Sequence, residues 1–274
     1  MTDREMSDEE FPKAVTASAA EGQLDIAANP DLTEDLALAL LKNPDLHPEV
    51  LERLAKNSHA LKSRKVRLAV VSHPHTPRHV SVPLARQLYT FDLMKVALAP
   101  GVPADVKVAI DDVLIARLST VALGERLTLA RRASGRVAAA LLLDVGAKGK
   151  GAALDAGNRK NDQKDRQKKS AEIEARETRV VQIALDNPRL TEALVISSVL
   201  RPIAGAALVQ AVARHPKWSP RREVRAALLR TEHLSLACAL EFSQEILGAA
   251  LAELLSSSRL PEKIKDVLLR RDRE

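Results

Sequence analysis

The chain has 274 residues and a formal net charge of +6, and 46% of its residues are hydrophobic, which is enough to bury a core. Aromatic residues make up only 2%, so the core must be aliphatic, and a single cysteine excludes an intrachain disulfide. The N-terminus lacks an apolar leader and no run approaches about 18 uncharged apolar residues. We therefore expect a cytoplasmic protein with no membrane span.

The first half of the chain reads as a series of short helices. Residues 1–20 are acidic, polar and rich in alanine, which predicts a flexible tail. The first part of a helical array is predicted over 21–145. We expect its helices at 33–41, 47–57, 62–72, 77–89, 91–98, 103–118, 123–132 and 135–144. The last of these is apolar on nearly every side, which indicates burial between neighbours.

The stretch 43–57 sets the pattern for this array. Pro44 has no N–H and disfavours helix at Asn43, so the preceding helix must end there. Pro48 suits the first position of the next helix, because its fixed φ is helical and its missing donor is not needed. One apolar face then follows at helical spacing, made of Val50, Leu51, Leu54 and Ala55.

The same punctuation recurs along the chain. Residues 29–34 and 187–192 share an N-P-x-L-T-E pattern, although they lie in opposite halves. Pro44 and Pro74 are 30 residues apart, Pro74 and Pro100 are 26 apart, and Pro188 and Pro216 are 28 apart. Periods of roughly 20–50 residues are typical of stacked repeats, here with room for two short helices each. Proline turns in an ordinary helical bundle are the alternative.

The composition changes sharply after the first part of the array. Residues 146–170 contain no Val, Ile or aromatic residue and many charges, which predicts a disordered basic linker over 146–175. A second part of the array is predicted over 176–274, with helices at 190–200, 203–214, 220–230, 233–243, 245–256 and 261–271. Because N-P-x-L-T-E stands on both sides, we prefer one array with an inserted loop over two domains.

The repeated unit resembles the bacterial leucine-rich repeat variant and, more loosely, HEAT-like repeats. The resemblance rests on the N-P or H-P stop, the Thr or Pro helix start and the V-L-x-x-L-A body at 50–55, and it is clearest over 25–100 and 184–230. It implies a right-handed α-solenoid, that is, a superhelix of short helix pairs with a concave surface. Proteins of those families serve mostly as binding scaffolds, and the resemblance carries over no catalytic residue.

Two basic clusters are candidate contact sites for nucleic acid or an acidic partner. One surrounds Pro216 and comprises Arg214, Lys217, Arg221, Arg222, Arg225 and Arg230; the other comprises Arg131, Arg132 and Arg136. Arg221 and Arg225 share a helix face, as phosphate contacts would require. The alternative, which we favour, is a solvated face paired with Glu223 and Glu232. We expect Trp218 to pack rather than to stack on bases, and the linker cations to belong to a tether.

Other constellations are weaker. His73, His75 and His79 could supply metal ligands, but no acid or cysteine lies nearby, so polar turn residues are the preferred interpretation. The pair Asp111-Asp112 could suggest a DNA-glycosylase-like enzyme, yet adjacent helical residues point in different directions. We find no phosphate-loop, nucleophile-elbow or zinc-protease motif, and so assign no catalytic, cofactor or metal residue.

The expected function is therefore a non-enzymatic helical repeat scaffold that binds a protein partner through its concave face. The second hypothesis is a nucleic-acid-binding solenoid that uses the basic turns and the linker. The sequence sets neither the partner nor the oligomeric state.

Overall fold

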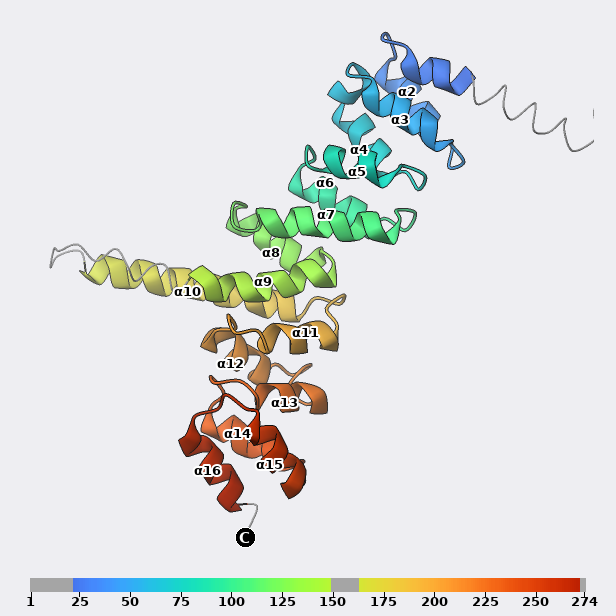
Figure 1. Cartoon of the computed structure of the whole chain (residues 1–274). Helices are drawn as coiled ribbons and strands as arrows, with labels where there is room; N and C mark the ends of the chain where they lie inside the picture. The colour runs from blue at the N-terminus through green and yellow to red at the C-terminus, as the bar shows by residue number, and fades with distance from the viewer. Residues whose placement is uncertain (1–21, 149–162, 272–274) are drawn as a thin grey trace, which may run out of the picture. The chain divides into compact units, whose positions relative to one another are not determined.

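The computed structural model describes residues 22–148 and 163–271, and throughout these ranges the regular elements are helices (Figure 1). The chain divides into two compact units between Leu114 and Ile115, so each is described by itself. Within the described residues, none of the helices combines the length and the apolar character needed to span a membrane.

Unit 1 comprises a helix at 22–28 and the elements up to α7, whose last three residues belong to unit 2. Their bounds are α2 (Glu34–Leu41), α3 (Pro48–Lys56), the 3-10 turn η1 (Ala60–Lys62), α4 (Arg64–Ser72), α5 (Arg78–Ala85), α6 (Thr90–Leu98) and α7 (Ala104–Arg117). Helix α4 packs against both α2 and α6, so the even-numbered helices of this unit lie in one row.

Unit 2 is built in two layers. Its helices are α8 (Leu123–Arg132), α9 (Gly135–Lys148), α10 (Gln163–Leu185), α11 (Glu192–Val199), α12 (Ala206–Arg214), α13 (Arg222–Leu228), α14 (Leu236–Ser243), α15 (Gly248–Ser256) and α16 (Glu262–Arg271). Helix α10 packs between α8 and α12, and helix α11 packs between α9 and α13. We call α9, α11 and α13, together with α15, the odd layer.

The predicted helices are confirmed to within a few residues over most of the chain, because their end signals act as expected. The side chains of Thr33, Ser63 and Ser235 each accept a backbone N–H from the first turn of the following helix. Pro48 is the first residue of α3, as predicted. Helix α9 is buried by α8, α10, α11 and α12, which confirms the reading of its all-round apolar sequence.

The proline turns share a second feature that gives them a structural role. Two residues after the proline stands a side chain that is at most 4% exposed in every case, namely Leu32, Leu46, Thr76, Val102, Leu190 and Trp218. Each turn therefore anchors itself by inserting one side chain into the core, and the bulk of that side chain is free to vary from valine to tryptophan.

The residue before the proline closes the turn. The Oδ1 atoms of Asn29, Asn43 and Asn187 accept the backbone N–H two residues later, at 2.9, 3.1 and 2.8 Å. His73 and His215 do the same through Nδ1, at 3.3 and 3.2 Å. Asparagine and histidine interchange here because each presents an acceptor to that amide and a donor on its other side.

The donor side reaches back past the intervening turn to an earlier one, and Asn57, which precedes Ser58 and not a proline, does the same. Asn57 Nδ2 donates to the carbonyl of Asn29 at 2.7 Å and His73 Nε2 donates to that of Asn43 at 2.9 Å, across 28 and 30 residues. His215 Nε2 lies 3.2 Å from the carboxylate of Asp186, across 29 residues. Asn187 instead bridges 57 and 54 residues, to the carbonyls of Ala130 and Ala133.

Two expectations need correction. Helix α10 begins at Gln163, where we expected a disordered linker; Lys, Glu, Arg and Ala are good helix formers, and the pair Glu172–Arg176 supports the helix at i,i+4 spacing. The sequence also leads us to expect Phe91 among the core contacts between neighbouring helices, together with Leu93, Met94 and Val96. Phe91 is instead 37% exposed, because the buried face of α6 begins with the next residue, Asp92. The predicted tail over 1–20 and the linker centre over 149–162 lie outside the described residues.

Candidate functional site

The basic residues around Pro216 do not form a bare cationic surface. Arg221 Nη1 lies 2.6 Å from Glu192 Oε2, and Arg225 Nη1 is paired with Glu245 while its Nε donates to the carbonyl of Ser219 at 2.7 Å. The solvated-face interpretation named Glu223 and Glu232 as the partner acids, and that detail is wrong. The acids that pair with these arginines come from elements next to α13 in space.

Trp218 is a packing residue, as expected. It is 1% exposed, and its Nε1 donates to the carbonyl of Leu185 at 2.8 Å. Lys217 Nζ and the guanidinium of Arg221 lie 4.3 and 5.3 Å from the centre of its ring. These two cations therefore cover an indole that is closed to a stacking base.

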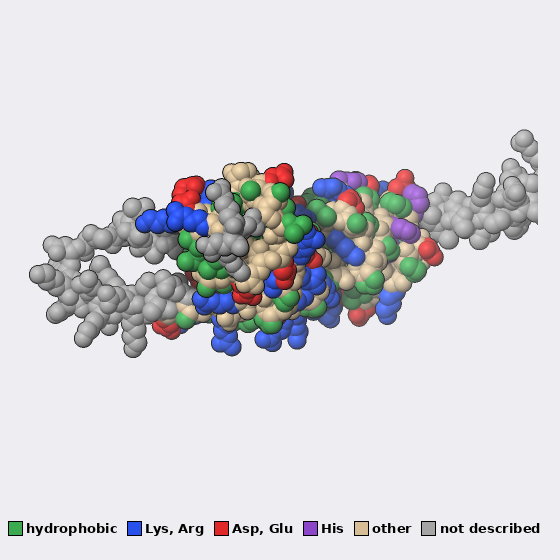
Figure 2. Space-filling model, turned by 90° about the horizontal axis from the view of Figure 1, so that it is seen from below, with side chains coloured by type: hydrophobic (Ala, Val, Ile, Leu, Met, Phe, Trp, Pro, Cys, Tyr) green, Lys and Arg blue, Asp and Glu red, His purple; other side chains and the backbone are tan. Residues whose placement is uncertain are grey.

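The remaining predicted cations lie apart on several elements. Arg131 and Arg132 are exposed in the last turn of α8, Arg214 ends α12, and Arg222 opens α13. Figure 2 shows Lys and Arg side chains interspersed with acidic and uncharged surface on the face in view. Scattered charge of this kind is typical of a solvated surface.

The histidines and the aspartate pair likewise have structural partners. His73 and His75 hydrogen-bond to the carbonyls of Asn43 and Leu46, and His79 lies 3.2 Å from Glu52. Within the described ranges no group of three or more His, Cys, Asp or Glu side chains is placed to hold a metal ion. Asp111 is buried and its neighbour Asp112 is exposed, so the two do not face a common cleft.

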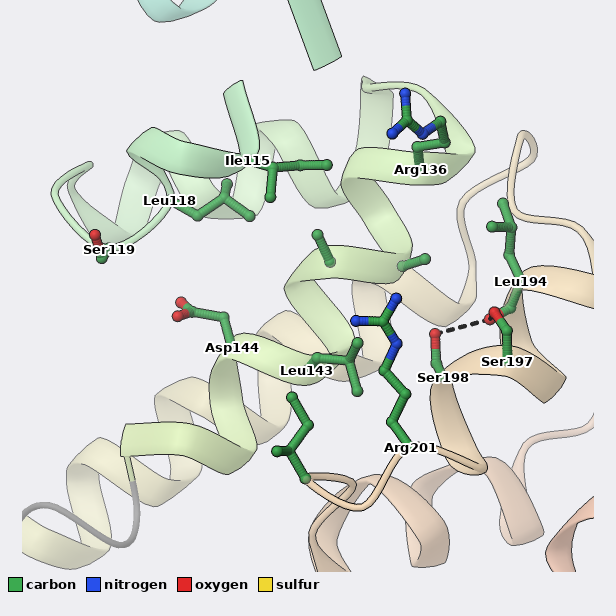
Figure 3. Close-up of a pocket in the computed structure, with 13 residues that line it drawn as sticks. Ile115, Leu118, Ser119, Arg136, Leu143, Asp144, Leu194, Ser197, Ser198 and Arg201 are labelled. Atoms are coloured by element: carbon green, nitrogen blue, oxygen red, sulfur yellow. Dashed lines mark hydrogen bonds between the residues drawn. The ribbon is translucent and has the colours of Figure 1, made fainter. Parts of the chain in front are cut away.

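A pocket of about 410 Å³ lies on the odd layer of unit 2 (Figure 3). Three elements line it: the end of α7, the middle of α9, and α11 with the bend that follows it. We call it the α9–α11 pocket; its lining residues are Ile115, Leu118, Ser119, Arg136, Ala139, Ala140, Leu143, Asp144, Leu194, Ser197, Ser198, Arg201 and Ile203. Its size falls within the range of small-ligand and side-chain pockets.

The pocket exists because small residues occupy facing positions on two packed helices. Ala139 and Ala140 stand on α9 and Ser197 and Ser198 on α11, where larger side chains would fill the space. The two serine hydroxyls are turned back to the carbonyl of Leu194, at 3.0 and 2.7 Å. The interior is therefore mainly aliphatic, with hydroxyl groups already engaged by the backbone.

The rim of this pocket is cationic. Asp144 is neutralised by Arg126, whose Nη2 lies 2.7 Å away, and both side chains are largely buried. Arg136 and Arg201 also line the pocket, and Figure 3 shows Arg201 extending between Leu143 and Ser198. An apolar hollow with guanidinium groups at its mouth suits an apolar group that carries a carboxylate.

A second hollow of about 330 Å³ lies on the same layer, between α13 and α15. We call it the α13–α15 pocket. It combines apolar side chains, including Ile246 and Leu254, with two arginines, Arg222 and Arg230, and two acids, Glu223 and Glu253. The two hollows thus occupy one helix layer of unit 2, on either side of the packed pair α11–α13.

Sequence reasoning missed the α9–α11 pocket and Arg201. The signal was present but weak: two pairs of adjacent small residues, Ala139-Ala140 and Ser197-Ser198, stand on helices that are otherwise rich in large aliphatic residues. Only the packing of α9 against α11 turns these pairs into a cavity.

No protein-family model matches the chain, and no curated protein or solved structure shows significant similarity to it.

Proposed function

We propose that the chain is a right-handed α-solenoid of helix pairs that acts as a non-enzymatic scaffold for a protein partner. The repeat supports this architecture. Side chains bridge equivalent turns across 28, 30, 29 and 29 residues, at Asn57, His73, His215 and Ser258. The bonds from Asn187 span 57 and 54 residues. The longer span is one repeat of 30 residues, as at His73, plus about 27 more. This excess is close to the length of the segment that we expect to be inserted.

The α9–α11 pocket carries the functional part of the proposal. It is an aliphatic hollow of about 410 Å³ on the odd layer, which is the layer that we assign to the concave face. A pocket of this size takes one or two large apolar side chains, and such anchors dominate peptide recognition. Its serine hydroxyls donate to the carbonyl of Leu194 rather than to a base, so they lack the activation that a catalytic nucleophile needs.

Nucleic acid is the second candidate. Arg131, Arg132, Arg214 and Arg222 are exposed, and in the described part of the chain they are in no ion pair. The pairing of Arg221 and Arg225 with carboxylates and the burial of Trp218 weigh against this candidate. Random DNA and single-stranded RNA titrated over a salt series would show it as micromolar binding that falls steeply with salt.

The test of the proposal is a selection of peptides from a random display library on the purified full chain. Ser197→Trp places an indole in the α9–α11 pocket from an exposed position. Ser256→Trp is the matched control, because Ser256 is also an exposed serine in a last helical turn, with its hydroxyl bonded to the carbonyl three residues back, and it lies outside that pocket.

We expect peptides with large apolar residues to be enriched. Ser197→Trp should weaken their binding at least tenfold, whereas Ser256→Trp should leave it within about twofold, because only the first substitution fills the anchor site. A selection that enriches no peptide, or one whose peptides tolerate Ser197→Trp, contradicts the proposal.

A further inference from the structure

Three arginines stand at equal intervals along the odd layer. Arg201 follows α11, Arg230 follows α13 and Arg259 follows α15, and successive members are 29 residues apart (230 − 201 and 259 − 230). This interval equals the one across which the turns of the stack bond to each other. The three residues therefore occupy the same place in three successive repeats.

Hydrogen bonds bring the three residues to one edge of the layer. The backbone N–H of Arg259 donates to the carbonyl of Arg230 at 3.1 Å. The guanidinium of Arg259 reaches past that repeat and donates through Nη2 to the carbonyl of Leu200 at 3.1 Å, next to Arg201 in the chain. All three side chains belong to exposed residues. We call Arg201, Arg230 and Arg259 the arginine edge.

The three guanidinium groups of this edge carry their charge at exposed positions. In the part of the chain that the structure describes, none of the three guanidinium groups is in an ion pair, whereas Arg126, Arg221 and Arg225 each have a carboxylate. Like charges gathered in this way repel each other and create a positive potential, both of which an anionic ligand relieves.

The edge also adjoins both hollows. Arg201 lines the α9–α11 pocket and Arg230 lines the α13–α15 pocket. A ligand that lies along the edge can therefore reach an aliphatic cavity with a neighbouring group. This combination selects a chain that alternates carboxylates with apolar side chains.

We propose that the arginine edge binds the carboxylates of an acidic peptide segment whose apolar side chains enter the α9–α11 pocket. The inference rests on the proposed function and names the chemistry of its partner. Each guanidinium can hold a carboxylate in a bidentate pair. Packed helices lie about 8–10 Å apart, so Arg201 and Arg230, which follow the packed helices α11 and α13, have a similar spacing.

The geometry of an extended peptide matches that spacing. In a polyproline II chain, side chains three residues apart point the same way and are separated by about 9 Å. Acidic residues at i and i+3 can thus meet successive arginines of the edge. A polynucleotide fits less well, because the residues that line the α9–α11 pocket include no aromatic side chain on which a base could stack.

The experiment measures fluorescence anisotropy of a labelled nine-residue peptide, three repeats of Glu-Leu-Gly, on the full chain. The same peptide with Gln for Glu and a 15-nucleotide polyuridylate are the comparison probes. The test variant is Arg201→Gln/Arg230→Gln, since neither side chain makes a hydrogen bond or ion pair within the described residues; a third variant adds Arg259→Gln. Arg179→Gln/Arg270→Gln is the matched control, because it removes the same charge from exposed positions elsewhere in unit 2.

We expect the double edge variant to weaken binding of the glutamate peptide at least tenfold and the control to change it less than twofold. The glutamine peptide should bind at least tenfold more weakly than the glutamate peptide. Equal losses in both variants, equal affinity for both peptides, or no binding of the glutamate peptide at millimolar concentration would overturn the proposal. The proposal would also be overturned if the polyuridylate bound more tightly than the glutamate peptide and the edge variant abolished that binding.

This outcome can be separated from that of the proposed function. If the library yields peptides that depend on Ser197 but tolerate the edge variant, the scaffold function stands and the arginine edge is rejected. If the edge variant abolishes binding of the glutamate peptide while Ser197→Trp does not, the edge stands and the pocket is rejected as the anchor site.

Discussion

Both units hold successive turns together with an asparagine, but the chain between the bonded turns differs in length. In unit 1, Asn57 donates to the carbonyls of Ala27 and Asn29, and its Oδ1 accepts two backbone N–H groups at 3.1 Å. In unit 2, Asn187 makes the equivalent bonds across about twice as many residues. The contact is therefore specified by the turn itself and not by the length of the connecting chain.

The units also differ in how they use charge. In unit 1, Arg64 holds Asp92 with two bonds of 2.7 and 2.9 Å, and Glu34 accepts from both Ser63 and Lys65. Unit 2 has similar links at Arg221 and Arg225, but among the described residues the guanidinium groups of the arginine edge form no ion pair. The paired charges thus link neighbouring helices, whereas the arginine edge is, as proposed above, available to an external ligand.

The largest difference between the units should come from removing the turn asparagines. Asn187 is 1% exposed, and Asn187→Ala strands the carbonyls of Ala130 and Ala133 in the core, so we expect a loss of about 2–4 kcal/mol in the free energy of unfolding. Asn57 is only partly buried, and Asn57→Ala should cost about 1–2 kcal/mol, because water can replace its partners.

Fluorescence of Trp218, the only tryptophan, reports unit 2 in urea unfolding, and far-UV circular dichroism reports the whole chain. Asn187→Ala should lower the urea concentration at which the Trp218 fluorescence shows half of the protein unfolded. Equal losses for both substitutions would show that burial does not distinguish the two turns.

A smaller difference should separate two glycines. A Cβ on Gly135 would overlap the carbonyl oxygen of Arg189 and approach Leu194 Cδ1 to 3.0 Å, so helix α9 and the turn before α11 would have to move apart. We expect Gly135→Ala to lower the free energy of unfolding by about 1–3 kcal/mol. In unit 1, a Cβ on Gly101 meets only Pro74 Cβ at 4.0 Å, and Gly101→Ala should stay within about 0.5 kcal/mol. Thermal unfolding of the two variants measures this difference. Equal losses of stability would show that α9 is not packed this closely against the turn before α11.

The sequence predicts the helices well because the residues that start and stop them act on nearby backbone groups. Pro44, Pro48 and Thr33 act on their own backbone neighbours, so no knowledge of the fold is needed to place them. The start expected at residue 220 is less exact, because α13 begins at Arg222 and its N-cap, Arg221, makes no side-chain capping bond. The period between turns follows from the same residues. Helix α10 shows the limit, because charged residues that suit a linker are also good helix formers once a packed helix continues into them.

The candidate sites depend on contacts between distant residues, which the sequence does not display. Arg221 and Arg225 look like a free basic face until Glu192 and Glu245 are placed beside them. Arg201 and Arg259 look isolated until the packing of the repeats brings them to one edge. The spacing of 29 residues was readable, but only the bonded turns show that this interval joins equivalent positions.

The smallest expected effect is a pH dependence in unit 1. The guanidinium of Arg64 hydrogen-bonds to the Asp92 carboxylate and lowers the pKa of that buried group in the folded chain, against the opposing effect of burial. An unfolded aspartate titrates near about 3.9, so the pair stabilises the fold above that pH, and the contribution is lost as the pH falls through the lower folded pKa.

Asp92→Asn should therefore be less stable than the original chain at pH 7. The difference in the free energy of unfolding should narrow at pH 3, where the Asp92 carboxylate of the original chain is largely protonated in the unfolded state. Urea unfolding followed by far-UV circular dichroism at the two pH values measures this gap. Asp105→Asn is the control, because Asp105 is exposed and its oxygen lies 3.9 Å from Arg78 Nη1. It should change stability little at either pH, since exposed pairs contribute little. A gap for Asp92→Asn that stays constant or widens on acidification would mean that the carboxylate does not stabilise the contact between α4 and α6 through its charge.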